Sequence, residues 1–241
     1  MTESIQVKQV SKRFGQTTVL HDIDLTIEKG RIYGFIGPSG AGKTTLVRMI
    51  VGMDTVDDGD IYVFDKKMPD LTSLQNIGYM AQADSLYTTL TGRENLNFFA
   101  MLFKIKKSKR KERIDYTSDL VNLTDALDKK VSTYSGGMKR RLSLAIALIQ
   151  DPDILILDEP TVGIDPELRL DVWNELLRLK EEDGKTIIIT THVMDEAEKC
   201  DVVAMIRDGA ILTRGTPHEL MDVFHTDNLN DAFLRAGREQ A

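Results

Sequence analysis

This chain of 241 residues has a single cysteine, no long apolar run and no internal repeat. With Cys200 alone, neither an intrachain disulfide nor a zinc site built from cysteines can form, which suits a reducing compartment, and we expect a cytoplasmic location. No segment approaches the roughly 18 apolar residues that a membrane span requires, and the first residues lack the apolar core of a signal peptide. The sequence therefore predicts no membrane-spanning segment.

Basic residues are outnumbered by acidic ones, with Lys+Arg 31 against Asp+Glu 38 and a net charge of −7. Domains that bind nucleic acids are usually basic, so we expect no nucleic-acid partner. Hydrophobic residues make up 41% of the chain, which is enough for a core and argues against disorder. No linker rich in proline, glycine or serine divides the sequence, and residues 1–241 are predicted to form one domain.

Short apolar runs bounded by turn residues alternate with helical patterns along the chain. This alternation is typical of strand–helix–strand units, and it predicts an α/β fold with a mostly parallel sheet. The dipeptide Asp208–Gly209 tolerates the positive φ angles of a tight turn and predicts a hairpin between the last two strands. The predicted strands are Ile5–Val10, Arg31–Ile36, Ile61–Phe64, Ile77–Met80, Ile154–Leu157, Thr186–Thr190, Val202–Ile206 and Ala210–Thr213.

Capping residues mark the start of a long helix late in the chain. Asp165 can accept hydrogen bonds from the first amides, Pro166 has the φ angle of a first helical turn, and Gly184 ends the apolar stripe. We expect this helix to pack against the sheet.

A purely helical pattern begins at Thr91, which has the spacing of a capping box with Glu94. It predicts an inserted helical lobe over about residues 91–150, with the remaining core formed by residues 1–90 and 151–241.

A glycine-rich loop follows the apolar run that ends at Ile36 and precedes a helical pattern. In such a loop the glycines let consecutive amides point at phosphate oxygens, Lys43 reaches the β- and γ-phosphates, and the Thr44 hydroxyl can ligate the magnesium ion between them. The motif and its context favour nucleotide binding over a chance glycine-rich turn. The loop residues are Gly37, Pro38, Ser39, Gly40, Ala41, Gly42, Lys43, Thr44 and Thr45.

Two carboxylates, Asp158 and Glu159, end the apolar strand that begins at Ile154. Open α/β sheets bind ligands at the carboxyl ends of their strands. Asp158 can hold Mg²⁺ through water, and Glu159 can orient or deprotonate an attacking water. Solvated turn acids are the alternative, but beside a phosphate loop the pair predicts hydrolysis of a phosphoanhydride.

The segment YSGGMKRRLSLAIAL begins at Tyr134, is followed closely by ILILDEP, and resembles the signature motif of ABC-type ATPases, the ATP-binding subunits of membrane transporters. The resemblance covers nearly the whole chain. It implies a P-loop NTPase core with a mostly parallel sheet, an N-terminal antiparallel β portion and a helical lobe.

Further positions match the order of the family's motifs. The resemblance implies that Phe14 stacks on adenine, that Gln82 touches both magnesium and the permease, that Asp165 lies at the nucleotide, and that His192 binds the γ-phosphate and the attacking water. A core aromatic at Phe14 and a structural histidine at 192 remain the alternatives.

The signature residues Ser135, Gly136 and Gly137 begin a helix, so their amides can form a second anion site. In the family the signature of one subunit closes on the γ-phosphate held by the other, which places two Mg-ATP molecules between two subunits. A plain helix cap at Ser135 is the alternative.

The chain also departs from the family pattern, with Tyr134 in place of leucine and Met138 in place of glutamine. Methionine cannot donate the hydrogen bonds of an amide, so any contact that the glutamine makes must be replaced. The loop before Asp165 differs as well. These motif variants resemble those of exporters of drugs, lipids or surface polymers more than those of importers.

The resemblance implies an ATPase that works as a homodimer or heterodimer with a second ABC subunit and powers a multi-span permease at the inner face of the cell membrane. Two alternatives remain: a soluble ABC ATPase of an assembly system, such as iron–sulfur cluster assembly, and a phosphate-loop kinase in which Glu159 activates a substrate hydroxyl. The run KIKKSKRKER from Lys104 to Arg113 is either a solvated helix face or a patch facing anionic headgroups or the permease.

Overall fold

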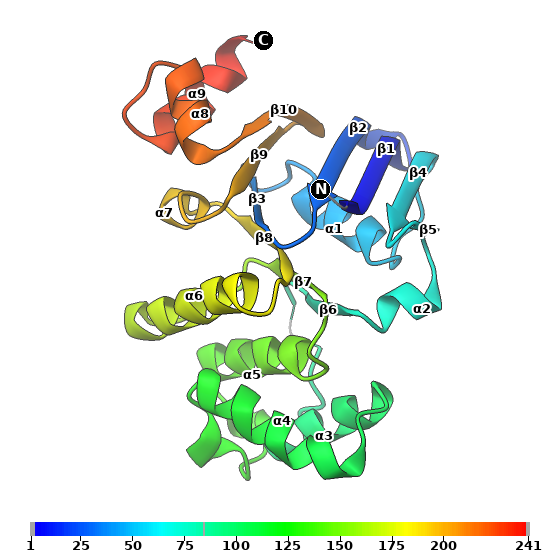
Figure 1. Ribbon diagram of the computed structural model, residues 1–241, viewed down its shortest axis with the longest axis vertical. Helices are drawn as coiled ribbons and strands as arrows, with labels where there is room; N and C mark the ends of the chain where they lie inside the picture. Colours follow the sequence, from blue (N-terminus) through cyan, green and yellow to red (C-terminus); the bar gives the residue numbers. More distant parts are fainter. Residues whose placement is uncertain (1–2, 84, 240–241) are drawn as a thin grey trace. The chain divides into compact units, whose positions relative to one another are not determined.

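The computed structural model describes residues 3–83 and 85–239 (Figure 1). The chain divides into two compact units, of which the first comprises Met1–Ser73 and Thr186–Ala241 and the second Leu74–Lys185. No helix among the described residues is long and apolar enough to cross a bilayer.

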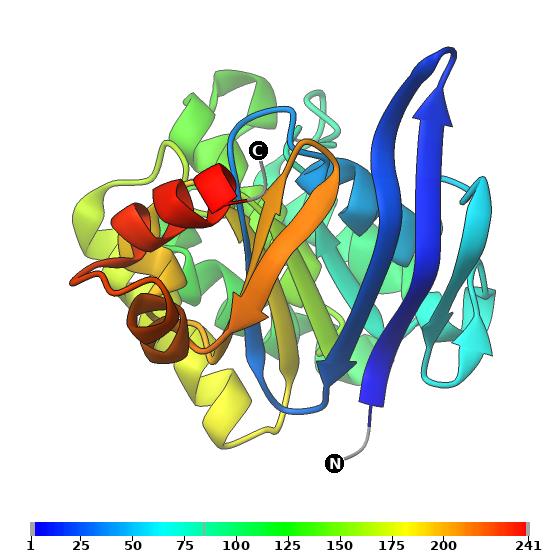
Figure 2. The same cartoon turned by 90° about the horizontal axis from the view of Figure 1, so that it is seen from above.

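An antiparallel sheet forms the N-terminal part of the first unit (Figure 2). Its strand order is β2-β1-β4-β5, and the implied N-terminal antiparallel portion is confirmed. The strands are β1 (Glu3–Phe14), β2 (Thr17–Glu28), β4 (Asp58–Val63) and β5 (Lys66–Lys67).

Strand β2 is absent from the predicted strands. Its inward residues Leu20 and Ile23 are buried, but they are separated by two exposed polar residues, His21 and Asp22. The register with β1 shifts at this point, and Asp22 has a φ of 47°. An irregularity of this kind breaks the alternation of polar and apolar residues from which a strand is recognised.

The second sheet of the first unit has the order β10-β9-β3-β8. Strand β3 pairs in parallel with both β8 and β9, whereas β9 and β10 form the predicted antiparallel hairpin, with positive φ at Asp208 and Gly209. Strands β3 and β8 are buried along their whole length, which explains their continuous apolar runs. The strands are β3 (Ile32–Ile36), β8 (Thr186–Thr191), β9 (Val202–Arg207) and β10 (Ala210–Gly215).

Helices complete the first unit. The first of them, α1, is the next element after β3, α7 contacts β3 and β8, and α8 and α9 contact each other and β10. Their bounds are α1 (Lys43–Ile50), α7 (Met194–Ala197), α8 (Pro217–Val223) and α9 (Leu229–Glu239). A short helix, α2 (Leu71–Leu74), spans the passage from the first unit to the second.

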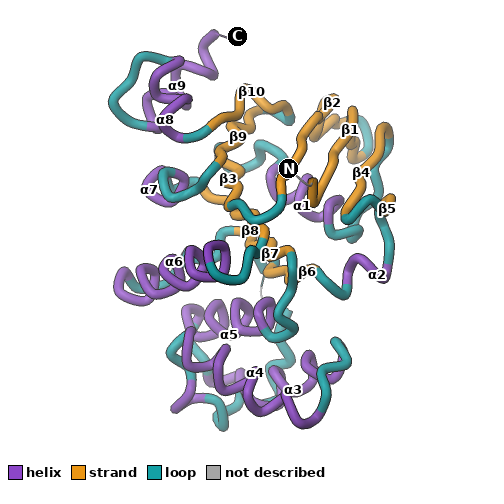
Figure 3. Tube along the Cα trace, viewed as in Figure 1, coloured by secondary structure: helices purple, strands orange, loops and turns teal. Residues whose placement is uncertain are grey.

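The second unit joins a parallel strand pair to a group of helices. Strands β6 (Ile77–Met80) and β7 (Ile154–Asp158) pair in parallel, and α5 contacts both of them. Figure 3 shows the helices α3, α4 and α5 together, with no strand between them in the described chain. The helices are α3 (Gly92–Leu102), α4 (Lys107–Leu120), α5 (Gly136–Leu148) and α6 (Pro166–Glu181), with the 3₁₀ turns η1 (Thr124–Ala126) and η2 (Val131–Thr133).

The predicted helix starts are confirmed in this unit. Thr91 and Glu94 form both hydrogen bonds of a capping box at α3, and Asp165 accepts from the Leu168 amide at 3.0 Å at the start of α6. The basic run begins just before α4 and continues into its first half, and most of its side chains are exposed. Arg113, its last residue, is half-buried and donates to the carbonyls at the end of α5. The patch facing lipid or permease stays a prediction.

Candidate nucleotide site

The glycine-rich loop lies between β3 and α1, as its motif predicts. Gly42 is the N-cap of α1 with a φ of 103°, and a Cβ atom there would lie 2.6 Å from Leu20 Cδ2. A Cβ atom on Gly37 would lie 2.0 Å from the carbonyl oxygen of Ile206. Both positions therefore require glycine, one for its backbone conformation and both for the close approach of neighbouring chain.

The Lys43 side chain is buried within this loop, with 6% of its surface exposed. Its ammonium donates to the carbonyl oxygens of Gly37 at 2.7 Å and Pro38 at 3.0 Å. The positive charge is thus held against the start of the loop, on the first residue of α1, where the amides of a helix N-terminus also favour anions. Thr44 and Thr45 follow on the same turn and are half-buried.

Phe14 lies at the end of β1 with 51% of its surface exposed, so the interpretation as a core aromatic is wrong. The Lys12 ammonium lies 5.4 Å from the centroid of the Phe14 ring and 3.0 Å from a carboxylate oxygen of Asp57. Asp57 also accepts a hydrogen bond from the backbone amide of Arg13. This bond, and to a smaller extent the hydrogen bond from Lys12, lowers the pKa of Asp57. An exposed ring on a fixed strand end is available for stacking.

His192 follows β8 directly and is exposed. The preceding residue fixes this turn, because the buried Thr191 hydroxyl donates to Glu196 at 2.8 Å and accepts from the Val193 amide at 3.0 Å. The turn is thus well defined, while contact of His192 with a phosphate stays a prediction.

In the second unit, the acidic pair lies at the carboxyl end of β7. The Asp158 side chain is 1% exposed, and Glu159 is half-buried with a φ of 52°. A left-handed conformation costs a residue with a side chain about 1 kcal/mol, and such conformations cluster at functional sites. The two neighbours therefore differ in environment, as their different predicted roles require.

The signature begins α5, where the Ser135 hydroxyl accepts from the Met138 amide at 3.2 Å. Ser135 is therefore a helix cap, and it is exposed together with Gly136. Capping uses the serine hydroxyl and does not exclude an anion at the amides of this turn, so the second anion site stays a prediction.

Tyr134, the first departure from the family pattern, has a structural role. Its ring is buried, and its hydroxyl donates to the Ala126 carbonyl at 2.7 Å. Burial raises the pKa of this phenol. A Cβ atom on Gly92 would meet the Tyr134 hydroxyl at 2.3 Å, so the tyrosine fills the space above the first turn of α3.

Gln82 lies in the exposed segment after β6, and its backbone carbonyl accepts from Arg140 at 2.9 Å. The same guanidinium donates to the carbonyl of Glu159 at 2.6 Å. The structure thus links these two predicted site residues through an arginine that the sequence analysis passed over.

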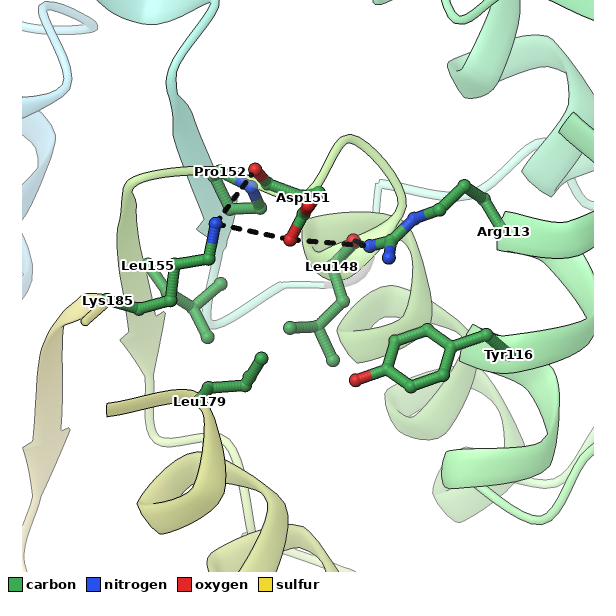
Figure 4. A pocket seen from close by; sticks show the side chains of 8 residues that line it. All are labelled: Arg113, Tyr116, Leu148, Asp151, Pro152, Leu155, Leu179 and Lys185. Carbon is green, nitrogen blue, oxygen red and sulfur yellow. Dashed lines mark hydrogen bonds and ion pairs between the residues drawn. The ribbon is translucent and has the colours of Figure 1, made fainter. Parts of the chain in front are cut away.

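A small cavity in the second unit lies apart from these residues (Figure 4). Leucine side chains line it, and at its rim Asp151 lies 3.2 Å from Lys185 and 4.0 Å from Arg113. Its volume of about 10 Å³ could hold no more than one water molecule. It is a packing gap under an ion-pair cluster and no ligand site.

Residues 20–162 match the family model described as ABC transporter. The Nod factor export ATP-binding protein I of Rhizobium meliloti (strain 1021) is 42% identical over 224 residues, which are 92% of this chain and 67% of that protein. The similarity thus extends beyond the phosphate loop to most of both chains.

Solved structures give the same result. An ATP-binding subunit of an ABC transporter has a TM-score of 0.90 at 25% identity and covers 97% of this chain and 99% of that one. A dimeric ATP-binding cassette in a post-hydrolysis state, bound to ADP and Pi, has a TM-score of 0.81 at 27% identity, with 88% and 98% covered. The chain therefore belongs to the ABC transporter family, as an ATP-binding subunit that hydrolyses ATP to ADP and phosphate.

Proposed function

We propose that this chain is the ATPase subunit of an exporter, which closes as a dimer on two Mg-ATP molecules and drives a separate membrane permease. The observation that carries the proposal is the Ser135–Gly137 turn at the start of α5, in which Ser135 and Gly136 are exposed. It is a helix start suited to an anion, in addition to the phosphate loop at α1. Similarity to a Nod factor export ATP-binding protein supports export, and similarity to a dimeric cassette supports the dimer.

In this proposal the first unit binds both ends of the nucleotide, the adenine and the phosphates. Phe14 stacks on adenine, the amides of residues 37–45 bind the phosphates, and Lys43 changes its hydrogen-bond acceptors from the loop carbonyls to the β- and γ-phosphates. The exposed Phe14 ring and the buried Lys43 ammonium support these roles. Asp165 supplies a further contact near the nucleotide beyond its capping bond.

A magnesium ion would be held by Thr44, Gln82 and Asp158. Hydroxyl, amide and carboxylate oxygens are the hard ligands that Mg²⁺ prefers, and the buried Asp158 carboxylate at a strand end has the chemistry required. The ion would neutralise charge on the β- and γ-phosphates.

Glu159 would orient the attacking water and accept its proton, and His192 would donate a hydrogen bond to the γ-phosphate. ATP favours the closed dimer because Ser135 and the following amides of a second subunit contact the γ-phosphate only in that state. Hydrolysis removes this contact, so the dimer reopens.

The helical lobe and the Gln82 segment would transmit closure to the permease at the inner face of the membrane. The partner cassette is a second copy of this chain or a related subunit. Co-purification with a multi-span membrane protein would separate this proposal from a soluble ABC ATPase of an assembly system, which has no such partner.

The decisive experiment uses Glu159→Gln, which keeps the size of the side chain and removes its basicity. We expect this variant to bind Mg-ATP, to hydrolyse it at least about 100-fold more slowly than wild type, and to accumulate as a dimer. Size-exclusion chromatography with light scattering measures the dimer, and Glu167→Gln on the first turn of α6 is the control. A Glu159→Gln protein that stays monomeric with saturating Mg-ATP contradicts the proposal.

A further inference from the structure

The Arg140 side chain, on α5, is buried with 7% of its surface exposed. Its guanidinium donates to four backbone carbonyls in two segments that lie far apart in the sequence. The acceptors are Ala81 at 2.7 Å, Gln82 at 2.9 Å, Glu159 at 2.6 Å, and Asp158.

Each terminal nitrogen of Arg140 serves one segment. Nη1 donates to the carbonyls of the segment that contains Gln82, and Nη2 donates to those of the turn that contains Glu159. These segments follow the paired parallel strands β6 and β7, so the guanidinium bridges the carboxyl ends of both strands. Only a planar fork with separated donors can do this, since the three donors of a lysine ammonium radiate from one atom.

The turn that Arg140 holds has an unfavourable backbone conformation. Glu159 has a φ of 52° and precedes Pro160, and no glycine relieves the turn at this position. Conformations of this kind persist only where the surrounding structure fixes them. A hydrogen bond to the carbonyl of Glu159 fixes the peptide plane that follows it and, with it, the direction in which the Glu159 side chain leaves the backbone.

The same helix begins with the signature. Ser135 caps α5, and Arg140 follows it on the same rigid element. A displacement of the start of α5 would therefore act on the Gln82 segment and on the Glu159 turn through one side chain.

We propose that Arg140 is a positioning residue, which holds the Glu159 turn and the Gln82 segment in the arrangement required for hydrolysis and couples both to the signature helix. This inference rests on the proposed roles of Glu159 and Gln82. In this inference Arg140 affects the rate of hydrolysis, whereas the phosphate loop determines nucleotide binding.

The neighbouring Arg141 provides a matched control. It has the same charge on the same helix, but its guanidinium donates to the carbonyls of Val121 and Asn122, at 3.4 Å and 3.0 Å, near the end of α4. Arg141 makes none of the Arg140 contacts described above, so the same substitution there separates positioning from loss of a helix-surface arginine.

The experiment compares Arg140→Lys with Arg141→Lys by steady-state ATP hydrolysis and by titration with a fluorescent ATP analogue. We expect Arg140→Lys to lower kcat about tenfold or more while KM and the nucleotide Kd change less than about twofold, since small misplacements of catalytic groups have effects of this size or larger. Arg141→Lys should keep all three values near those of wild type. Millimolar methylguanidinium should restore part of the kcat of Arg140→Ala and none of that of Arg141→Ala.

A kcat of Arg140→Lys within about twofold of wild type overturns the inference. Equal losses in Kd and kcat that follow a lowered melting temperature, without rescue, also overturn it, because they indicate a purely structural residue. If Arg140→Ala does not fold, the kcat, KM and Kd of Arg140→Lys still test the inference. Glu159→Gln is measured in parallel: wild-type turnover of that variant would contradict the proposed catalytic role itself, whereas an inactive Glu159→Gln beside a fully active Arg140→Lys would contradict the Arg140 inference alone.

Discussion

The phosphate loop is shaped by residues within it, since Gly42 adopts a left-handed conformation and the Lys43 ammonium folds back onto the carbonyl of Gly37. The Glu159 turn contains no glycine at its left-handed position and is held from outside by Arg140, 19 residues earlier in the chain. The shape of such a loop can be recognised from a short pattern, whereas the support that a distant side chain gives to a turn cannot. We therefore expect changes in the loop to affect binding and changes around α5 and the turn to affect turnover.

The largest effect on turnover after Glu159→Gln should come from Ser135→Arg. If the start of α5 binds the γ-phosphate of the opposite subunit, as proposed, a long cation there would occupy the space that this phosphate requires. We therefore expect kcat to fall at least about 100-fold while a monomer binds ATP normally. Ser132→Arg, at an exposed position just before the signature, is the control. Wild-type turnover of Ser135→Arg would refute the role in the opposite site, and a matching loss of ATP affinity would break the division between binding and turnover.

The next effect is on binding. In the proposed site Lys43→Ala would remove a charge-assisted hydrogen bond to phosphate, worth about 1.5–3 kcal/mol, so the nucleotide Kd should rise about 10- to 100-fold. Titration with a fluorescent ATP analogue measures this, with Lys29→Ala at an exposed position as the control. An unchanged Kd would contradict the proposed role of Lys43 in nucleotide binding.

A smaller change is expected for Phe14→Ala. If Phe14 stacks on adenine as proposed, loss of this contact should cost about 1 kcal/mol and raise the Kd for ATP about fivefold. The melting temperature should stay near that of wild type because the ring is half exposed. Phe14→Tyr keeps a ring and should bind normally. An equal effect of both substitutions would argue against stacking.

Tyr134→Phe should have the smallest effect on function. It removes the hydrogen bond to the Ala126 carbonyl and should lower the free energy of unfolding by about 1 kcal/mol, without a change in Kd or kcat. Chemical denaturation with urea measures the free energy of unfolding. Titration with a fluorescent ATP analogue measures Kd, and steady-state kinetics measures kcat. A fall in kcat beyond what the stability loss explains would connect this departure from the family pattern to turnover.

The sequence predicted those parts whose shape depends on neighbouring residues. The buried strands β3, β7 and β8 were evident from their continuous apolar runs, and the glycines and Lys43 of the loop lie together in the chain. Strand β2 was not predicted because its irregularity at His21 and Asp22 breaks the alternation.

The role of Arg140 could not be predicted for a different reason. In the sequence it resembles its neighbours Lys139 and Arg141, and only the folded second unit shows which of the three is buried against the ends of β6 and β7. The signal was present as an arginine inside an otherwise recognisable motif, but its partners come from segments 58 and 18 residues away, at Gln82 and Asp158.

The burial of the Lys43 side chain inside its own loop affects the free energy of nucleotide binding. A lysine side chain that is freely mobile loses up to about 2 kcal/mol of rotamer entropy when it is immobilised. In this chain the ammonium is already confined by two carbonyls. If Lys43 binds the phosphates as proposed, an arriving triphosphate would exchange one pair of acceptors for another on a side chain whose freedom was lost during folding. Recognition at the loop thus begins from a preorganised cation, and the affinity of the loop reflects the difference between carbonyl and phosphate as acceptors more than the cost of ordering the side chain.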